Sequence, residues 1–213
     1  MSLSVSLHML ARAPEPGLVK FRLIPTLGED GACDLQRLLL EHALITLPPD
    51  DFDPRILWLD GDPDESLERL AAEHGWTLIE QPPGDLGERM RRIVTLGLSS
   101  NDAVILVCND CPVLDGDYLA AAREALQERD VVVGPAEDGG FVLLGLRRVD
   151  PLLFAEIPWG CEEVLAQTCE RLRQLGWEHL LLPELWDVDR PEDLQRLAEL
   201  GIHLAAYAAV LPR

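Results

Sequence analysis

Short apolar runs alternate with segments of helical periodicity along almost the whole chain, and this alternation restricts the fold more than any other feature. The runs that we predict to be strands are residues 5–10, 55–59, 76–80, 104–108, 131–133, 141–144 and 179–182. The segments with helical spacing or capping signals are residues 28–47, 62–73, 115–127 and 161–175, with a closing helix after residues 187–194. Such alternation predicts an α/β fold, with a mostly parallel sheet inside a three-layer α/β/α sandwich.

The chain is long enough for one full hydrophobic core and a little short for two. Its 213 residues contain no internal repeat and no low-complexity linker, so we predict a single domain over residues 1–213. Pro48-Pro49 is expected to end the first long helix. The apolar segment 202–211 is consistent either with packing on the body of the protein or with contact to a second subunit, so a homo-oligomer stays open.

The charge balance excludes several classes of partner. The chain has 38 acidic and 18 basic side chains, a formal net charge of −20. Such a protein repels polyanions, which argues against binding to nucleic acid or to an anionic membrane surface. We see neither a signal peptide nor an apolar run of membrane-spanning length. The five cysteines show no paired metal-site spacing, and reduced thiols favour a cytoplasmic protein.

One strand delivers a carboxylate directly to its carboxyl end. Residues 104–108 are aliphatic or small, Asn109 and Asp110 follow, and Pro112 ends the regular structure. An aspartate at the end of a buried strand is a candidate metal ligand or a simple turn cap. Its neighbours in the fold must decide between these two interpretations.

The loop after the first strand concentrates positive charge in an otherwise acidic chain. Two prolines and a glycine exclude regular structure there, and the loop carries Arg12, Lys20 and Arg22. One interpretation is a solvated surface loop. The other is a cradle in which the three cations neutralise the phosphates of a nucleotide.

The remaining unusual polar loops also follow strands. They contain Asp85 and Arg89, then Glu137 and Asp138, then Asp187 and Asp189. In open α/β sheets the carboxyl ends of parallel strands share the edge where ligands bind. We therefore expect these side chains to converge with Asp110 and with the three cations of the first loop.

Metal-assisted phosphate handling is the chemistry that this set of groups suits. Asp110 and one of Asp187 or Asp189 would offer hard oxygen ligands to Mg²⁺ or Mn²⁺. The glycines at positions 84, 87, 139 and 140 (Gly84, Gly87, Gly139, Gly140) would let a ligand approach the backbone closely. Each group also has a structural interpretation: Asp138-Gly139 is a common hairpin turn, and Asp189 with Pro191 is a good helix start.

Six segments together resemble a known bacterial family. They are residues 13–23, 84–90, 110–112, 134–141, 157–160 and 187–194. They resemble, in order and over nearly the whole chain, glycosyltransferase-A-like proteins formerly of unknown function, some of them labelled arsenosugar-biosynthesis glycosyltransferases. The family is related to phospholactate guanylyltransferase and to molybdopterin nucleotidyltransferases.

The resemblance implies a nucleotide-diphospho-sugar transferase (GT-A, Rossmann-like) fold and a role for each segment. It implies that Asp110 and Asp189 bind the metal, and that residues 84–89 approach the base and ribose. It also implies that residues 137–140, with Trp159, contact the donor sugar or the acceptor. Phe21, Asn109 and Cys161 depart from the family pattern, since each stands where the resemblance leads us to expect threonine.

Three functional hypotheses follow. The first is a metal-dependent glycosyltransferase that uses a nucleoside-diphosphate donor and a small acceptor, with Asp138 or Glu137 orienting the sugar or acting as base. The second is a nucleotidyltransferase, and the absence of a glycine-rich first loop disfavours it. The third, motivated by the three departures, is a non-catalytic nucleotide-binding or interaction protein.

Overall fold

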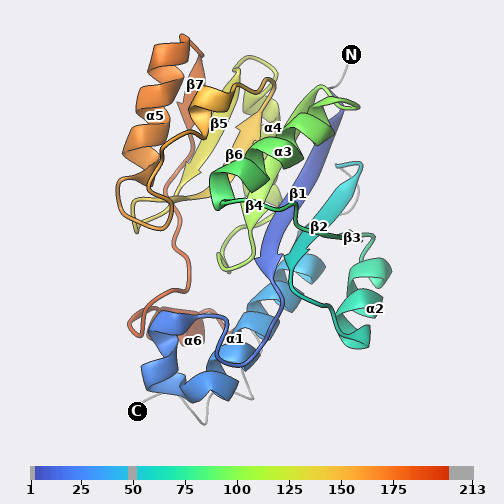
Figure 1. Cartoon of the computed structure of the whole chain (residues 1–213), viewed down its shortest axis with the longest axis vertical. Helices are drawn as coiled ribbons and strands as arrows, with labels where there is room; N and C mark the ends of the chain where they lie inside the picture. Colours follow the sequence, from blue (N-terminus) through green and yellow to red (C-terminus); the bar gives the residue numbers. More distant parts are fainter. Residues whose placement is uncertain (1–2, 48–51, 202–213) are drawn as a thin grey trace.

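A computed structural model describes residues 3–47 and 52–201 (Figure 1). The expected helix end at Pro48-Pro49 and the apolar segment 202–211 lie outside the described residues. In the described part of the chain, no helix is long and apolar enough to cross a membrane.

The architecture is built on one seven-stranded sheet with the order β3-β2-β1-β4-β6-β5-β7. Its strands are β1 (Val5–Arg12), β2 (Arg55–Asp60), β3 (Thr77–Glu80), β4 (Ala103–Cys108), β5 (Val131–Pro135), β6 (Phe141–Leu146) and β7 (His179–Leu181). Only β6 runs antiparallel to its neighbours β4 and β5, and the other strand pairs are parallel. The predicted mostly parallel sheet is confirmed, and so is the position of each predicted strand. The prediction of a single domain stays a prediction.

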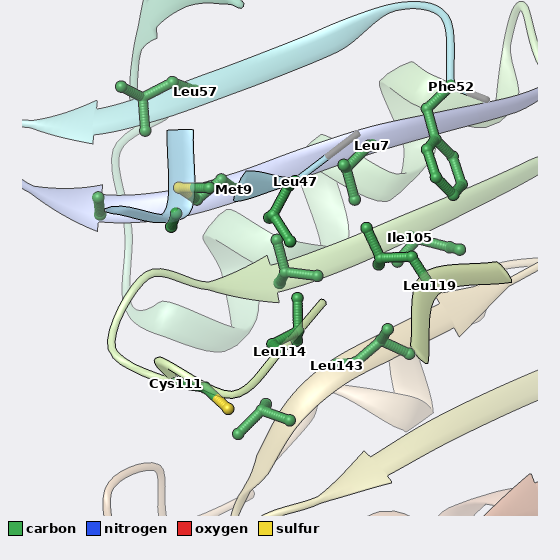
Figure 2. Packing of buried hydrophobic residues seen from close by; sticks show 14 of the residues in the cluster. Leu7, Met9, Leu47, Phe52, Leu57, Ile105, Cys111, Leu114, Leu119 and Leu143 are labelled. Carbon is green, nitrogen blue, oxygen red and sulfur yellow. The ribbon is translucent and has the colours of Figure 1, made fainter. Parts of the chain in front are cut away.

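The helices of the described chain cover both faces of the sheet. They are α1 (Ile24–Thr46), α2 (Glu65–Glu73), α3 (Leu86–Leu98), α4 (Gly116–Ala125), α5 (Val164–Leu175) and α6 (Asp193–Glu199), with 3₁₀ turns η1 (Phe21–Leu23) and η2 (Pro151–Leu153). One buried cluster joins α1, α2 and α4 to the sheet, and Figure 2 shows part of it around Leu7, Met9 and Ile105. A second cluster joins α3 and α5 to the opposite face, through Ile93, Val104 and Leu106. The side chains of β4 thus alternate between two cores, as the pleat of a strand requires.

Two helix starts differ from the prediction. The helix expected from residue 28 begins at Ile24, because Pro25 fits a first turn and Gly28 makes a non-helical kink with φ 73° and ψ 171°. The expectation that Asp189 is the N-cap of the closing helix was wrong, since the N-cap of α6 is Glu192. Instead, the Asp193 carboxylate accepts hydrogen bonds from the backbone N–H groups of Asp189 and Arg190. This turn precedes the helix, and the Asp189 side chain is not needed as a helix cap.

A third buried cluster holds the last described helix against the first. Leu194 and Leu197 of α6 pack with Trp186 and Val188 on Leu35 and Leu39 of α1. Figure 1 shows the two helices side by side at one end of the molecule, far from α5. The packing brings residues 186–189 back to the end of the sheet where the first loop lies.

A buried polar network lies inside the sheet at His8. The Trp58 Nε1–H donates to His8 Nδ1 at 2.9 Å, which leaves His8 Nε2 as the donor to Ser6 Oγ at 2.9 Å. Burial lowers the pKa of His8 to about 4. The imidazole is therefore neutral in the folded protein at neutral pH.

This network predicts a loss of stability on mild acidification. The pKa of His8 is lower in the folded protein than in the unfolded chain, so its contribution is present above about pH 6.5 and is lost as the pH falls towards 4. We expect the free energy of unfolding to fall by about 2–3 kcal/mol between pH 7.5 and 4.5 from this group alone. His8→Gln keeps one acceptor and one donor without titrating, so urea unfolding of that variant should show a shallower pH dependence. Equal pH dependence in the two proteins would contradict the assignment.

Candidate functional site

The carboxyl ends of the parallel strands share one edge of the sheet, and a cavity of about 740 Å³ opens there. Its volume lies in the usual range for small-molecule sites. Eight of the residues predicted from the sequence line it: Arg12, Lys20, Arg22, Gly84, Asp85, Arg89, Asp110 and Asp189. The expected convergence of the loops after β1, β3 and β4 with the segment before α6 is thus present in the structure.

An ion pair between Lys20 and Asp110 lines this cavity. Lys20 Nζ lies 3.0 Å from Asp110 Oδ2 and also donates to the Val188 carbonyl at 2.7 Å. The Lys20 side chain is 5% exposed, whereas that of Asp110 is 30% exposed. Lys20 adopts a left-handed backbone conformation with φ 47°, which is uncommon for a residue with a side chain. Lys20 thus combines an uncommon backbone conformation with an ammonium group that contacts two oxygens.

The charge of Lys20 decides the protonation of Asp110. Burial by itself raises the pKa of Asp110, but attraction to Lys20 and hydrogen bonds from Lys20 and Cys108 lower it below its usual value. The Val188 N–H also donates to the Asp110 backbone carbonyl at 2.9 Å, which fixes the neighbouring segment. Asp110 is thus an ionised carboxylate at the end of β4.

Asp187, one of the two alternatives for a second metal ligand, is electrostatically crowded. Burial raises its pKa to about 7, and repulsion from Asp110 and Asp138 adds to the effect. These repulsions indicate that Asp187 lies near the carboxylates of Asp110 and Asp138. Within residues 3–47 and 52–201, however, no three His, Cys, Asp or Glu side chains are grouped so that they could hold a metal ion by themselves.

Asp189, the other alternative, lines the cavity and forms an ion pair with Arg22. The two residues are 167 positions apart in the sequence. Asp189 is brought there by the turn before α6 and by the packing of that helix on α1. The predicted phosphate-binding cation and the predicted metal ligand thus contact each other.

A second polar cluster was missed by the sequence analysis. Asp60, at the end of β2, accepts from Arg89 Nη1 at 2.8 Å and lies 4.0 Å from Arg12 Nε. Gln81 donates to the carbonyls of Ala11 and Trp58 and accepts from Arg89. Asp60 is the last residue of an apolar strand, and Asp110 lies two residues beyond the end of another. The same sequence signal would therefore have identified Asp60. The cluster fixes the loop before α3, whose Gly84 carbonyl also accepts from Arg89 at 2.9 Å.

Backbone N–H groups at the start of α3 have hydrogen-bond partners within the protein. Asp85 caps the helix by accepting from the Glu88 N–H, and the Glu88 side chain accepts from the Asp85 N–H in a capping box. Gly87 is buried, and a Cβ there would lie 2.5 Å from Trp159 Nε1. Gly87 therefore permits close packing of α3 on Trp159, and it is not among the residues that line the cavity. Trp159 in turn packs edge-to-face on Phe141, which does line the cavity.

The predicted sugar or acceptor loop, residues 137–140, is a tight turn between β5 and β6 and lies outside the cavity lining. Both carboxylate oxygens of Glu137 accept from Arg196 of α6, at 2.6 and 2.9 Å, and this pairing lowers the pKa of Glu137. Asp138 Oδ1 accepts from the Gly140 N–H at 2.8 Å. Gly139 has φ 87°, and a Cβ there would lie 2.2 Å from the Glu162 carbonyl oxygen. The hairpin-turn interpretation therefore accounts for the two glycines.

Two of the three residues that depart from the family pattern lie in the cavity. Phe21 is 54% exposed and lies at the start of η1 between Lys20 and Arg22. Asn109 is 6% exposed, and its Nδ2 has no hydrogen-bond partner among the described residues. A buried amide without a partner is rare in folded proteins, so Asn109 is a candidate ligand-binding residue. Cys161 is elsewhere, with its thiol donating to the Pro158 carbonyl.

The five cysteines are free thiols. Burial raises the pKa of Cys108 well above its usual value and that of Cys111 to about 12. Both residues are therefore protonated beside Asp110, which argues against nucleophilic use of this pair.

The family relationship follows from residues 44–161, more than half of the chain. They match a family described as an uncharacterized protein conserved in bacteria (DUF2064). The chain belongs to this family. A search of curated proteins gave no match.

Solved structures give the fold a broader context. A Desulfovibrio desulfuricans G20 protein, provisionally assigned as a nucleotide-diphospho-sugar transferase, is 29% identical, with a TM-score of 0.86 over 97% of this chain and 96% of that one. A cytidylyltransferase from Leptospira borgpetersenii is 13% identical, with a TM-score of 0.58 over 98% and 97% of the two chains. Glucosyl-3-phosphoglycerate synthase from Mycobacterium tuberculosis, in complex with Mn²⁺ and UDP, is 14% identical, with a TM-score of 0.55 over 99% and 81%. At these identities the last two show a similar fold and nothing more. The similarity to the Desulfovibrio protein identifies the fold as that of nucleotide-diphospho-sugar transferases.

The crowding of Asp187 predicts a pH effect on the ligand-free protein. Its pKa is higher in the folded protein than in the unfolded chain, so its contribution to stability is present below about pH 4 and is lost as the pH rises through 7. We expect Asp187→Asn to be more stable than the wild type by roughly 2–4 kcal/mol at pH 8, with a smaller difference at pH 5. Urea unfolding at the two pH values measures this. Asp117→Asn, on the exposed first turn of α4, is the control and should show no such trend.

Proposed function

We propose that the protein is a metal-dependent glycosyltransferase that moves a sugar from a nucleoside-diphosphate donor to a small acceptor. The observation that carries the proposal is the position of Asp110, at the end of β4, in one cavity with Arg12, Lys20 and Arg22. The similarity of nearly the whole chain to a provisional nucleotide-diphospho-sugar transferase supports it. The free thiols and the acidic composition fit a cytoplasmic protein that acts on a small molecule.

The cations of the first loop are suited to the diphosphate. Guanidinium and ammonium groups form charge-assisted hydrogen bonds to phosphate oxygens, and a guanidinium group can do so with two parallel bonds. Arg12 and Arg22 are exposed for more than half of their side-chain area, so both can turn towards a ligand. Lys20 is buried and lines the same cavity.

The residues around Asp110 fit a divalent metal that is completed by the substrate. Asp110 offers a hard oxygen ligand, and Asp187, whose pKa is raised to about 7 mainly by burial, is also repelled by the charge of Asp110, a repulsion that a cation would relieve. Since the described side chains do not supply three ligands, phosphate oxygens would supply the others, as is usual for Mg²⁺. When bound, such an ion stabilises charge on the leaving diphosphate. The Asn109 amide, beside Asp110, would hydrogen-bond the same part of the ligand.

The remaining roles follow from what each side chain is free to do. Asp60 and Arg89 hold the Gly84 loop in place for the base and ribose. Of the two predicted catalytic carboxylates, Asp138 is the better candidate, because both oxygens of Glu137 are held by Arg196. Asp138 Oδ2 has no hydrogen-bond partner within the described residues and would accept a proton from, or orient, an acceptor hydroxyl.

Nucleotidyl transfer is the second candidate function. The fold is shared with cytidylyltransferases at TM-scores similar to that of the glucosyl transferase, so the fold itself does not separate the two reactions. The same cations and the same carboxylates would serve a triphosphate. A non-catalytic nucleotide-binding or interaction protein is the third candidate, motivated by Phe21, Asn109 and Cys161.

Metal-dependent nucleotide binding tests the role of Asp110. We expect Asp110→Asn to weaken binding of a nucleoside diphosphate in the presence of Mn²⁺ by at least about 100-fold, since the carboxylate is the central metal ligand. Calorimetry with UDP, GDP, CDP and ADP, each with Mn²⁺ and with EDTA, measures it, and Asp117→Asn is the control. Circular dichroism shows whether the variant is folded. Unchanged affinity in a folded variant would refute the proposed role.

The products distinguish the candidate reactions. Incubation with a panel of nucleotide sugars, with water as the acceptor, should release a nucleoside diphosphate and the free sugar, and incubation with triphosphates should release no pyrophosphate. Anion-exchange chromatography separates these products. Release of pyrophosphate alone would favour nucleotidyl transfer. Nucleotide binding without either product would favour the non-catalytic alternative.

A further inference from the structure

Every cation that lines the cavity in the described part of the chain is already paired with a carboxylate. Lys20 contacts Asp110, Arg22 contacts Asp189, and Arg12 and Arg89 both approach Asp60. With Asp85, the lining has four cations and four carboxylates, so its formal charges cancel. The cavity therefore offers a free phosphate no net positive charge, within a protein of net charge −20.

Lys20 holds the position that a metal ion at Asp110 would use. Its ammonium group contacts two oxygens, Asp110 Oδ2 at 3.0 Å and the Val188 carbonyl at 2.7 Å. The Lys20 side chain is buried, and its backbone lies in the left-handed region. The conformation of the loop therefore places the ammonium group at these two oxygens. Two cations cannot occupy the same side of one carboxylate without strong repulsion. A divalent ion that binds Asp110 Oδ2 must therefore compete with Lys20.

Competition between a divalent ion and Lys20 for Asp110 favours the binding of a phosphate. When a divalent ion takes the carboxylate, the ammonium group loses its counter-ion and needs another anion. A diphosphate supplies that anion and also further ligands for the metal. Arg22 and Asp189, at the side of the same cavity, form a second pair to which the same argument applies.

We infer that Lys20, with Arg22, is an internal counter-ion that suppresses metal binding in the free protein and couples the binding of a divalent cation to that of a nucleoside diphosphate. This inference rests on the proposed function. It makes Lys20 a positioning residue with two partners, Asp110 before the ligand binds and a phosphate afterwards. It also predicts that the free protein binds a divalent cation weakly.

Mn²⁺ alone is the probe that tests the inference, with electron paramagnetic resonance of the free ion as the readout. We expect Lys20→Met to bind Mn²⁺ at least about tenfold more tightly than the wild type in the absence of nucleotide, because a competing charge within hydrogen-bond distance of the ligand is removed. Arg129→Gln, which breaks an exposed pair with Glu178, is the matched control and should leave the affinity unchanged. Thermal unfolding shows whether each variant is folded.

Arg22→Gln keeps the test decisive if Lys20→Met does not fold, because the Arg22 pair is more exposed and its loss is tolerated better. That variant should bind Mn²⁺ about threefold more tightly. Unchanged or weaker Mn²⁺ binding in a folded Lys20→Met protein, or in Arg22→Gln where Lys20→Met is unfolded, would overturn the inference. Asp110→Asn distinguishes failure of this inference from failure of the proposed function. If it abolishes Mn²⁺ binding while Lys20→Met gives no gain, only the inference fails. If it leaves metal-dependent nucleotide binding intact, the proposed function fails.

Discussion

The buried contact between Lys20 and Asp110 is the interaction on which the cavity depends. It joins the loop after β1 to the end of β4, and the Val188 carbonyl brings in the segment before α6. β1 and β4 are paired as far as Leu10 and Cys108, so the Lys20–Asp110 contact joins the chain segments that follow the end of this ladder. Removing one partner of a buried ion pair leaves an uncompensated charge, which typically costs about 3–5 kcal/mol. The same pair therefore holds the loops together and sets the charge at the centre of the site.

Most of the fold was predictable, because each strand carries its own apolar signal and each helix its own periodicity. The differences arise where local chemistry acts over a few residues. Gly28 divides α1 because its backbone is non-helical, and the sequence pattern does not reveal that helical turns continue on both sides of it. Before α6, Asp193 takes the backbone hydrogen bonds that a cap at Asp189 would have taken. A glycine can end a helix or lie within a kinked one, and either aspartate can accept these backbone hydrogen bonds. Only the packed structure distinguishes these alternatives.

The location of the cavity was also predictable, but the ion pairs inside it were not. The rule that parallel strands share a carboxyl edge brings Arg12, Lys20 and Asp110 together without any further information. It does not say which cation meets which carboxylate, since Lys20 and Asp110 are 90 residues apart. Nor does it separate Gly84, at the cavity, from Gly87, which packs on Trp159. Glycines permit close approach of any partner, and spacing along the sequence does not identify that partner.

Under the proposed function, the paired charges explain how an acidic protein would select an anion. A net charge of −20 repels a diphosphate at long range, and salt screens this repulsion beyond about 10 Å. Inside the cavity the cations are held at fixed positions by Asp60, Asp110 and Asp189, so they are present without making the cavity attractive to every anion. Only a ligand that reaches several of them at once, and brings a cation for the carboxylates, satisfies all of these groups. The proposal therefore attributes selectivity to the number of charges exchanged, because a simple phosphate would displace too few of them.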